Sequence, residues 1–224
     1  KRTDEAKMKI KFCGNHSLQD VKLACESDAH YIGFVFAKSK RQVKPENVQK
    51  WLSQVNRKSE QQIVGVFVNN TIEFIEHAVR IASLDIVQLH GTETLAFAEL
   101  VKKTCNTDVW KVIHHDESAH ERMDQFRNVV DAYLIDNKSK RGWGGTGKAF
   151  DWSFVPRYVE KAHSFQKPCF IAGGVNVMNV RGLMKHQPDG IDLASGIETN
   201  LRKDKQKMIE LQERVKSNDD YITK

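Results

Sequence analysis

Short apolar runs alternate with longer stretches of mixed apolar and polar residues along almost the whole chain. The apolar runs predict strands over 9–13, 31–36, 63–68, 85–90, 109–114, 132–136, 169–174 and 190–195. The mixed stretches predict helices over 17–27, 45–56, 71–82, 93–103, 117–128, 151–163, 176–186 and 203–216. The strand segments are nearly continuous apolar runs, which is typical of strands buried on both faces.

Strict alternation of strand and helix favours a parallel sheet. Eight such pairs predict a single-domain (β/α)8 TIM barrel over 8–216, with an open doubly wound sheet as the alternative. We expect 217–224 to be a polar C-terminal tail. Met8 is expected to be the natural first residue, with 1–7 as a remnant of an expression vector. In a barrel, functional side chains lie at the carboxyl ends of the strands.

Composition narrows the class of protein. No apolar run approaches the roughly 20 residues of a membrane span, and the four cysteines are scattered without a C-x-x-C pair. These features predict a cytoplasmic protein with reduced thiols and no membrane partner. The net charge is +6, but the basic residues form no stripe interleaved with aromatic residues. We therefore expect no nucleic-acid partner, and an anionic small molecule fits the charge equally well.

The glycine-rich segment 142–148, GWGGTGK, is nearly a nucleotide-binding P-loop. Ala149 replaces the hydroxyl residue that would hold Mg²⁺, and five residues separate Asp136 from Gly142 instead of a direct strand-to-helix turn. These departures disfavour a nucleotide. A flexible connector is possible but leaves Asp136 unexplained. The glycines, including Gly145 and Gly147, predict a lid, because they permit the backbone changes that closure requires.

Two further glycine turns follow the seventh and eighth strands. They are AGGVN at 172–176, with Gly173 and Gly174, and ASGIE at 194–198, with Ser195 and Gly196. Loops at these two places in a barrel often bind phosphate through backbone N–H groups. The alternative is that both are ordinary turns. Their joint occurrence favours a phosphate site.

Three other strand ends carry candidate chemistry. Cys13 ends the first strand, where it is either a small core residue or a thiolate base or nucleophile. Asp136 ends the sixth, where a carboxylate either caps a turn or serves as a general acid. Arg41 follows the second, as a surface residue or a bidentate partner of a substrate carboxylate. The histidine-rich stretch 114–120 lacks metal-ligand spacing, so we predict no metal site.

Several motifs in chain order resemble the phosphoribosylanthranilate isomerase family of tryptophan biosynthesis. They are KIKFCGNHSLQDV, YIGFVFAKSKRQV, VGVFVN at 64–69, VQLHG at 87–91, the Asp136–Trp152 loop, AGGVN and DLASGIE. The resemblance runs from about Met8 to Lys207. It departs from the usual pattern at Lys40, Gln42, Asn137 and Ala194. These departures concern loop stiffness and pocket polarity rather than the candidate acid and base.

The resemblance implies an Amadori rearrangement of an aminoaldose to an aminoketose, without cofactor or metal. It implies Asp136 as the general acid that helps open the ribose ring and Cys13 as the general base at C2. Arg41 would bind the anthranilate carboxylate. The phosphate would be held by Gly173, Gly174, Ser195 and Gly196 with the glycine loop, while Gln88, His90 and Asp192 line the mouth.

The motifs also allow other interpretations. One is another phosphate-binding barrel, such as an indole-glycerol-phosphate synthase or a sugar-phosphate epimerase. Another is a non-catalytic phosphate-binding barrel, which the presence of both Cys13 and Asp136 disfavours. A nucleic-acid-binding module would need a clustered basic face. The expected assembly is a monomer or a homodimer.

Overall fold

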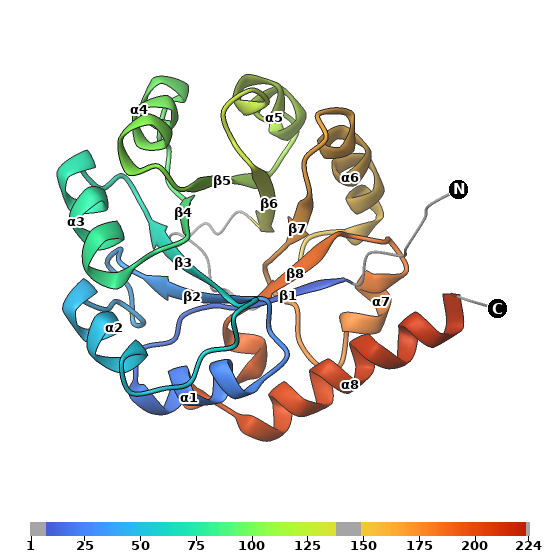
Figure 1. Ribbon diagram of the computed structural model, residues 1–224. Coiled ribbons are helices and arrows are strands. Elements are labelled where there is room, and N and C mark those ends of the chain that lie inside the picture. Colours follow the sequence, from blue (N-terminus) through green and yellow to red (C-terminus); the bar gives the residue numbers. More distant parts are fainter. Residues whose placement is uncertain (1–7, 138–148, 223–224) are drawn as a thin grey trace.

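The computed structural model describes residues 8–137 and 149–222, and it shows the predicted barrel (Figure 1). Eight parallel strands follow one another in chain order, and β8 closes the ring by pairing with β1. The strands are β1 Lys9–Phe12, β2 Tyr31–Val35, β3 Gln62–Phe67, β4 Ile86–Leu89, β5 Asp108–His115, β6 Ala132–Asn137, β7 Cys169–Ile171 and β8 Gly190–Leu193. The (β/α)8 prediction is confirmed.

Helices surround the ring of strands (Figure 1). They are α1 Leu18–Glu26, α2 Pro45–Leu52, α3 Ile72–Ala82, α4 Leu95–Cys105, α5 Ala119–Phe126, α6 Val155–Ser164, α7 Val180–Met184 and α8 Lys205–Ile222. Polar residues cap several helices at or near their predicted first residues. The side chains of Ser17, Thr71 and Thr94 each accept a hydrogen bond from a backbone N–H of the first turn that follows. Such caps satisfy donors that the helix itself leaves unpaired.

Successive residues of a strand face opposite ways, and both faces are buried. In β5, Trp110 and Val112 belong to the apolar cluster inside the barrel, whereas Val109 and Ile113 pack in the larger cluster under the helices. This double burial explains why the strands lack polar alternation in the sequence. The inner layer is largely apolar, and the fully buried Lys11 of β1 is a conspicuous exception.

The largest differences from the predicted elements lie in the last quarter of the chain. The helix predicted over 176–186 shortens to α7, because the Asn176 side chain accepts from Met178 N at 2.9 Å and forms a turn instead. A hairpin of β9 Glu198–Thr199 and β10 Arg202–Lys203 was not expected from the sequence. α8 extends to Ile222, so the predicted tail over 217–224 is helical through that residue.

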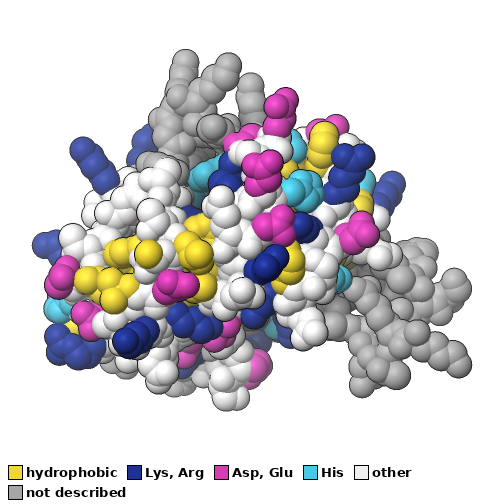
Figure 2. Space-filling view, turned by 90° about the horizontal axis from the view of Figure 1, so that it is seen from above, with side chains coloured by type: hydrophobic (Ala, Val, Ile, Leu, Met, Phe, Trp, Pro, Cys, Tyr) yellow, Lys and Arg dark blue, Asp and Glu magenta, His cyan; other side chains and the backbone are white. Residues whose placement is uncertain are grey.

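Charged side chains of both signs share the face seen in Figure 2. On this face, Lys and Arg are interspersed with Asp and Glu rather than gathered into one basic area. Within the described ranges, no helix combines the length and the apolar character of a membrane span.

Candidate active site at the barrel mouth

A cavity of about 910 Å³ opens at the carboxyl ends of the strands. This size lies within the usual range for small-molecule sites. Nine of the residues predicted from the sequence line it, namely Cys13, Arg41, Gln88, His90, Asp136, Gly173, Gly174, Asp192 and Ser195. Gly145 and Gly147 lie outside the described residues. The barrel thus brings together positions that are up to 182 residues apart, since Cys13 and Ser195 share one cavity.

Cys13 follows β1 and is buried beside a lysine of the same strand. Lys11 Nζ donates to Asp192 Oδ1 at 3.0 Å. Burial raises the pKa of the Cys13 thiol, and the cation of Lys11 opposes that shift. The sulfur lies against Gly33 of β2, where an ideal Cβ would stand 2.8 Å from Sγ. The thiol therefore sits in a tight pocket that contains a cation.

Asp136 reaches the same cavity from β6. It is 4% exposed, its Oδ1 accepts from Asn137 N at 2.7 Å, and its Oδ2 lies 3.2 Å from His90 Nε2. Gly173 is needed for this placement, because an ideal Cβ there would stand 2.5 Å from Asp136 Oδ1. Its φ of +78° also favours glycine. Gly173 therefore makes room for the carboxylate, in addition to its predicted place in the phosphate loop.

His114 joins His90 and Asp136 at this side of the mouth. The ligand atoms of the three side chains lie within 4.8 Å of one another, so the set can hold a metal ion by donor type and spacing. Burial lowers the pKa of His114, which favours the neutral imidazole. His115, the next residue, points the other way and hydrogen-bonds Tyr158 Oη at 2.8 Å. The two histidines face opposite ways because they are successive residues of β5. The proximity of His114 to Asp136 was not predicted from the sequence.

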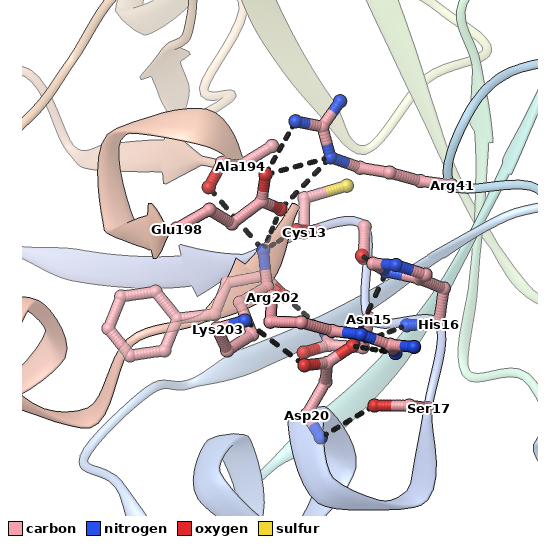
Figure 3. A network of polar contacts seen from close by, with 12 residues as sticks. Cys13, Asn15, His16, Ser17, Asp20, Arg41, Ala194, Glu198, Arg202 and Lys203 are labelled. Carbon is pink, nitrogen blue, oxygen red and sulfur yellow. Dashed lines mark hydrogen bonds and ion pairs between the residues drawn. The ribbon is translucent and has the colours of Figure 1, made fainter. Parts of the chain in front are cut away.

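Arg41 enters the cavity after β2 and is held by a buried carboxylate. Its Nε and Nη2 donate to Glu198 at 2.9 and 2.6 Å (Figure 3). Lys203 Nζ bonds the same carboxylate at 2.8 Å and also donates to the Cys13 carbonyl. The Glu198 side chain is only 4% exposed. Two cations and one anion leave this cluster with one net positive charge, which suits an anionic ligand.

The network continues behind the cavity to α1. Lys203 N donates to Asp20 Oδ1 at 3.0 Å, and His16 N donates to Asp20 Oδ2 at 3.1 Å (Figure 3). Asp20 is 1% exposed. The β9–β10 hairpin is therefore fixed to the first βα turn, and with it the carboxylate that orients Arg41.

The loops after β7 and β8 meet closely. Gly173 and Gly174 have φ of +78° and +73°. Asn179 Nδ2 donates a hydrogen bond to the Gly174 carbonyl at 2.8 Å. An ideal Cβ on Gly196 would stand 2.0 Å from the Val175 carbonyl oxygen. Gly196 thus serves close packing of the two loops and is not among the residues that line the cavity. Gly173, Gly174 and Ser195 do line it, as expected for a backbone anion site.

Gln88 of β4 lies at the cavity wall with 1% of its surface exposed. Its Oε1 is buried and has no hydrogen-bond partner within the described residues. A buried acceptor without a partner is costly. A hydrogen-bond donor on a bound ligand would satisfy it, so the position predicted for Gln88 supports a role in binding.

Sequence reasoning missed four residues of this region: Lys11, His114, Glu198 and Lys203. Lys11 carries a readable signal, because it stands two residues before Cys13 in an apolar strand and must therefore face the same side. The hairpin that brings Glu198 and Lys203 to Arg41 has no such signal. Its two strands are only two residues long.

A second cavity, of about 670 Å³, lies outside the barrel beside β5 and α5. Its charged groups are already paired: Lys111 Nζ lies 2.8 Å from Glu93 Oε2, and Arg122 Nη2 lies 2.9 Å from Asp116 Oδ1. The candidate acid and base line the mouth cavity instead. We therefore place the active site at the mouth.

The family model and the similar curated sequences indicate the same family. The sequence model of N-(5'-phosphoribosyl)anthranilate (PRA) isomerase matches residues 10–214. The N-(5'-phosphoribosyl)anthranilate isomerase of Geobacillus thermodenitrificans is 46% identical over 211 residues, which cover 94% of this chain and 95% of the relative.

Solved structures agree with the sequence match. A phosphoribosyl anthranilate isomerase from Thermotoga maritima has a TM-score of 0.82 and 30% identity, covering 94% of this chain and 99% of its own. Monomers generated from the dimeric Thermotoga maritima enzyme have a TM-score of 0.78 and 29% identity over 94% of this chain and 99% of theirs. A phosphoribosyl anthranilate isomerase in complex with reduced 1-(o-carboxyphenylamino)-1-deoxyribulose 5-phosphate has a TM-score of 0.79 and 28% identity, with the same coverage.

Proposed function

The chain belongs to the phosphoribosylanthranilate isomerase family, and from that membership we propose that Cys13 and Asp136 are its base and acid. The enzyme catalyses the Amadori rearrangement of N-(5'-phosphoribosyl)anthranilate to 1-(2-carboxyphenylamino)-1-deoxyribulose 5-phosphate in tryptophan biosynthesis. The observation that carries the assignment is that one cavity receives the thiol from β1 and the carboxyl from β6. The two strands lie well apart around the ring, with β7 and β8 between them on the shorter side.

In the proposed first step, Asp136 donates a proton to the ribose ring oxygen. The C1–O bond breaks, and the anilino nitrogen supplies the electron pair that forms the Schiff base. The hydrogen bond from Asn137 N and the contact with Gly173 fix the carboxyl, while His90 Nε2 lies 3.2 Å from its other oxygen. Fixed orientation of an acid is part of its catalytic effect.

In the proposed second step, the Cys13 thiolate removes the proton from C2. The electron pair of the C–H bond forms the C1–C2 double bond, and the iminium nitrogen becomes neutral. The resulting enolamine tautomerises to the aminoketose. A thiol whose pKa is raised by burial is a stronger proton acceptor once ionised. C1 is reduced and C2 is oxidised within the same molecule, so the rearrangement balances without an external electron acceptor.

The remaining predicted residues are proposed to hold the substrate. Arg41 lines the cavity while its Nε and Nη2 bond Glu198, and the net positive charge of its cluster favours the anthranilate carboxylate. Gly173, Gly174 and Ser195 offer backbone and hydroxyl groups to the phosphate. Gly196 supports that loop through its packing on Val175. Gln88 is proposed to accept a hydrogen bond from the sugar.

The proposal is tested by turnover of enzymatically generated phosphoribosylanthranilate, followed through the loss of anthranilate fluorescence. Cys13→Ser and Asp136→Asn should each lower kcat by several orders of magnitude, since removing a general acid or base costs about 10²–10⁴-fold. Both variants should keep the far-UV and near-UV dichroism of the parent. Full turnover in either variant would overturn its assigned role.

We further infer that the enzyme works in the cytoplasm as a monomer or a homodimer. Free thiols support the cytoplasmic setting, since Cys13, Cys25, Cys105 and Cys169 form no disulfide in the described ranges. At least one relative, from Thermotoga maritima, is dimeric. Sedimentation equilibrium at several protein concentrations decides between the two assemblies.

A further inference from the structure

One buried cation in the barrel has no part in the acid–base scheme. Lys11 is 0% exposed and lies in an interior that is otherwise built largely from apolar side chains such as Val64, Trp110 and Phe170. Its Nζ donates to Asp192 Oδ1 at 3.0 Å, and the Asp192 side chain is 10% exposed where it meets the cavity.

Stability alone does not account for this lysine. A buried ion pair stabilises a fold no better than well-packed apolar side chains of similar volume, because both charges lose their hydration. The position therefore calls for a function of the charge itself. Its neighbour Cys13 supplies one, since both residues are buried and two positions apart, and Asp192, the partner of Lys11, lines the same cavity as Cys13.

We propose that Lys11 is a positioning residue that favours ionisation of the Cys13 thiol against the effect of burial, with Asp192 fixing the ammonium on the same side of β1. Lys11 and Cys13 face the same side of β1 because they are two residues apart. Gly33 leaves room for the Cys13 sulfur, because an ideal Cβ on Gly33 would stand 2.8 Å from Sγ. The inference rests on the proposed role of Cys13 as the base.

The other charged groups around Cys13 define the electrostatic setting. Lys203 from β10 donates to the Cys13 carbonyl, and Arg41 lies over the next residue of the chain. The carboxylates beside these cations are Asp192 from β8, which accepts from Lys11, and Glu198 from β9, which bonds Lys203 and Arg41. Burial raises the pKa of the Cys13 thiol; Lys11 and Lys203 lower it, and Asp192 raises it. Lys11 has the largest effect among the charged groups.

The test measures how fast iodoacetamide alkylates Cys13 as a function of pH in the ligand-free enzyme. Peptide mass mapping follows Cys13 alone, so the other three cysteines do not contribute. The comparison is between Asp192→Asn and the double variant Lys11→Met/Asp192→Asn. The double variant removes both charges of the pair, so no unpaired charge stays buried. Lys58→Met, a lysine paired with Asp28 far from Cys13 in the sequence, is the control.

The double variant should show an alkylation midpoint about 1–3 pH units above that of Asp192→Asn, as expected when an opposite charge next to a titrating group is lost. Lys58→Met should keep the midpoint of the parent. Lys11→Gln, which retains a donor to Asp192, gives a second version of the test and should also raise the midpoint above that of the parent. Equal midpoints with and without the Lys11 charge would overturn the inference.

Turnover separates this inference from the proposed function. If Cys13 is the base, the acidic limb of kcat/KM moves in Lys11→Gln by the same amount as the alkylation midpoint. An alkylation shift without a turnover shift would confirm the effect of Lys11 on the thiol and contradict Cys13 as the base.

Discussion

The side chain of Arg41 crosses directly over the backbone of Gly14. An ideal Cβ on Gly14 would stand 2.4 Å from Arg41 Cδ, and the φ of Gly14 is +74°. The glycine that follows the proposed base therefore also makes room for the arginine proposed to bind the anthranilate carboxylate. Lys203 links Cys13 and Arg41 a second time, because its Nζ donates both to the Cys13 carbonyl and to Glu198, the carboxylate that orients Arg41.

Gly14→Ala should raise KM for phosphoribosylanthranilate more than it lowers kcat, because the new methyl group displaces Arg41 from the substrate carboxylate. The left-handed backbone should add roughly 1–2 kcal/mol of destabilisation. Steady-state kinetics and urea unfolding measure the two effects.

Gly182→Ala is the matched control for this substitution. Gly182 lies in α7, and the nearest heavy atom to its ideal Cβ is 4.0 Å away. The control should leave KM unchanged and stabilise the fold by about 0.5–1 kcal/mol. An unchanged KM in Gly14→Ala would contradict the placement of Arg41.

Glu198→Gln should weaken both binding and the fold. The variant leaves Arg41 and Lys203 without their shared anion, and loss of one partner of a buried ion pair costs about 3–5 kcal/mol. Because Arg41 loses a bidentate partner, KM should also rise.

The pH dependence of this variant follows from the pKa of Glu198. Burial raises it, but the hydrogen bond from Arg41 and the charge of Lys203 outweigh burial and hold it below the usual 4.5. A carboxyl with a depressed pKa stabilises the fold above its unfolded pKa and loses that contribution as the pH falls below it. Urea unfolding should therefore show a large difference between parent and variant at pH 7 that shrinks below about pH 4. A constant difference across this range would show that the charge of Glu198 is unimportant.

Gly173→Ala should lower kcat more than it raises KM, because its methyl group would displace Asp136, whose Oδ1 lies 2.5 Å from the ideal Cβ position. The effect on phosphate binding should be smaller, since Gly174 and Ser195 remain on the cavity wall. Steady-state kinetics separate the two parameters, with Gly182→Ala again as the control. A variant with raised KM and normal kcat would instead assign Gly173 to phosphate binding alone.

The sequence predicts the barrel well because each strand and helix has a local signal. Apolar runs mark the strands, and residues such as Ser17 and Thr94 mark the helix starts. Site residues could be predicted from the sequence where a polar residue or a cysteine ends a strand, as with Cys13 and Asp136. Arg41 was found in the same way, but its partner Glu198 was not. That pairing spans 157 residues and depends on a two-residue hairpin strand, which no local pattern encodes.

Some side-chain roles depend on distances that only the folded chain supplies. Gly173 was expected to serve phosphate, and its contact with Asp136 follows from the packing of β7 against β6. His114 was part of a stretch without metal-ligand spacing, yet the β4–β5 pairing brings it near His90 and the β5–β6 pairing places it beside Asp136. The spacing of residues along one segment cannot reveal a group of ligating side chains that comes from three different strands.

The assignment of Asp136 as the acid and Cys13 as the base is tested most directly by substrate deuterated at C2 of the ribose. In Cys13→Ser, proton removal from C2 should limit the residual rate, so kcat/KM should show a primary deuterium isotope effect. In Asp136→Asn, ring opening should become limiting, and the isotope effect should fall toward unity. An isotope effect that is lost in Cys13→Ser and retained in Asp136→Asn would contradict the assignment of both residues.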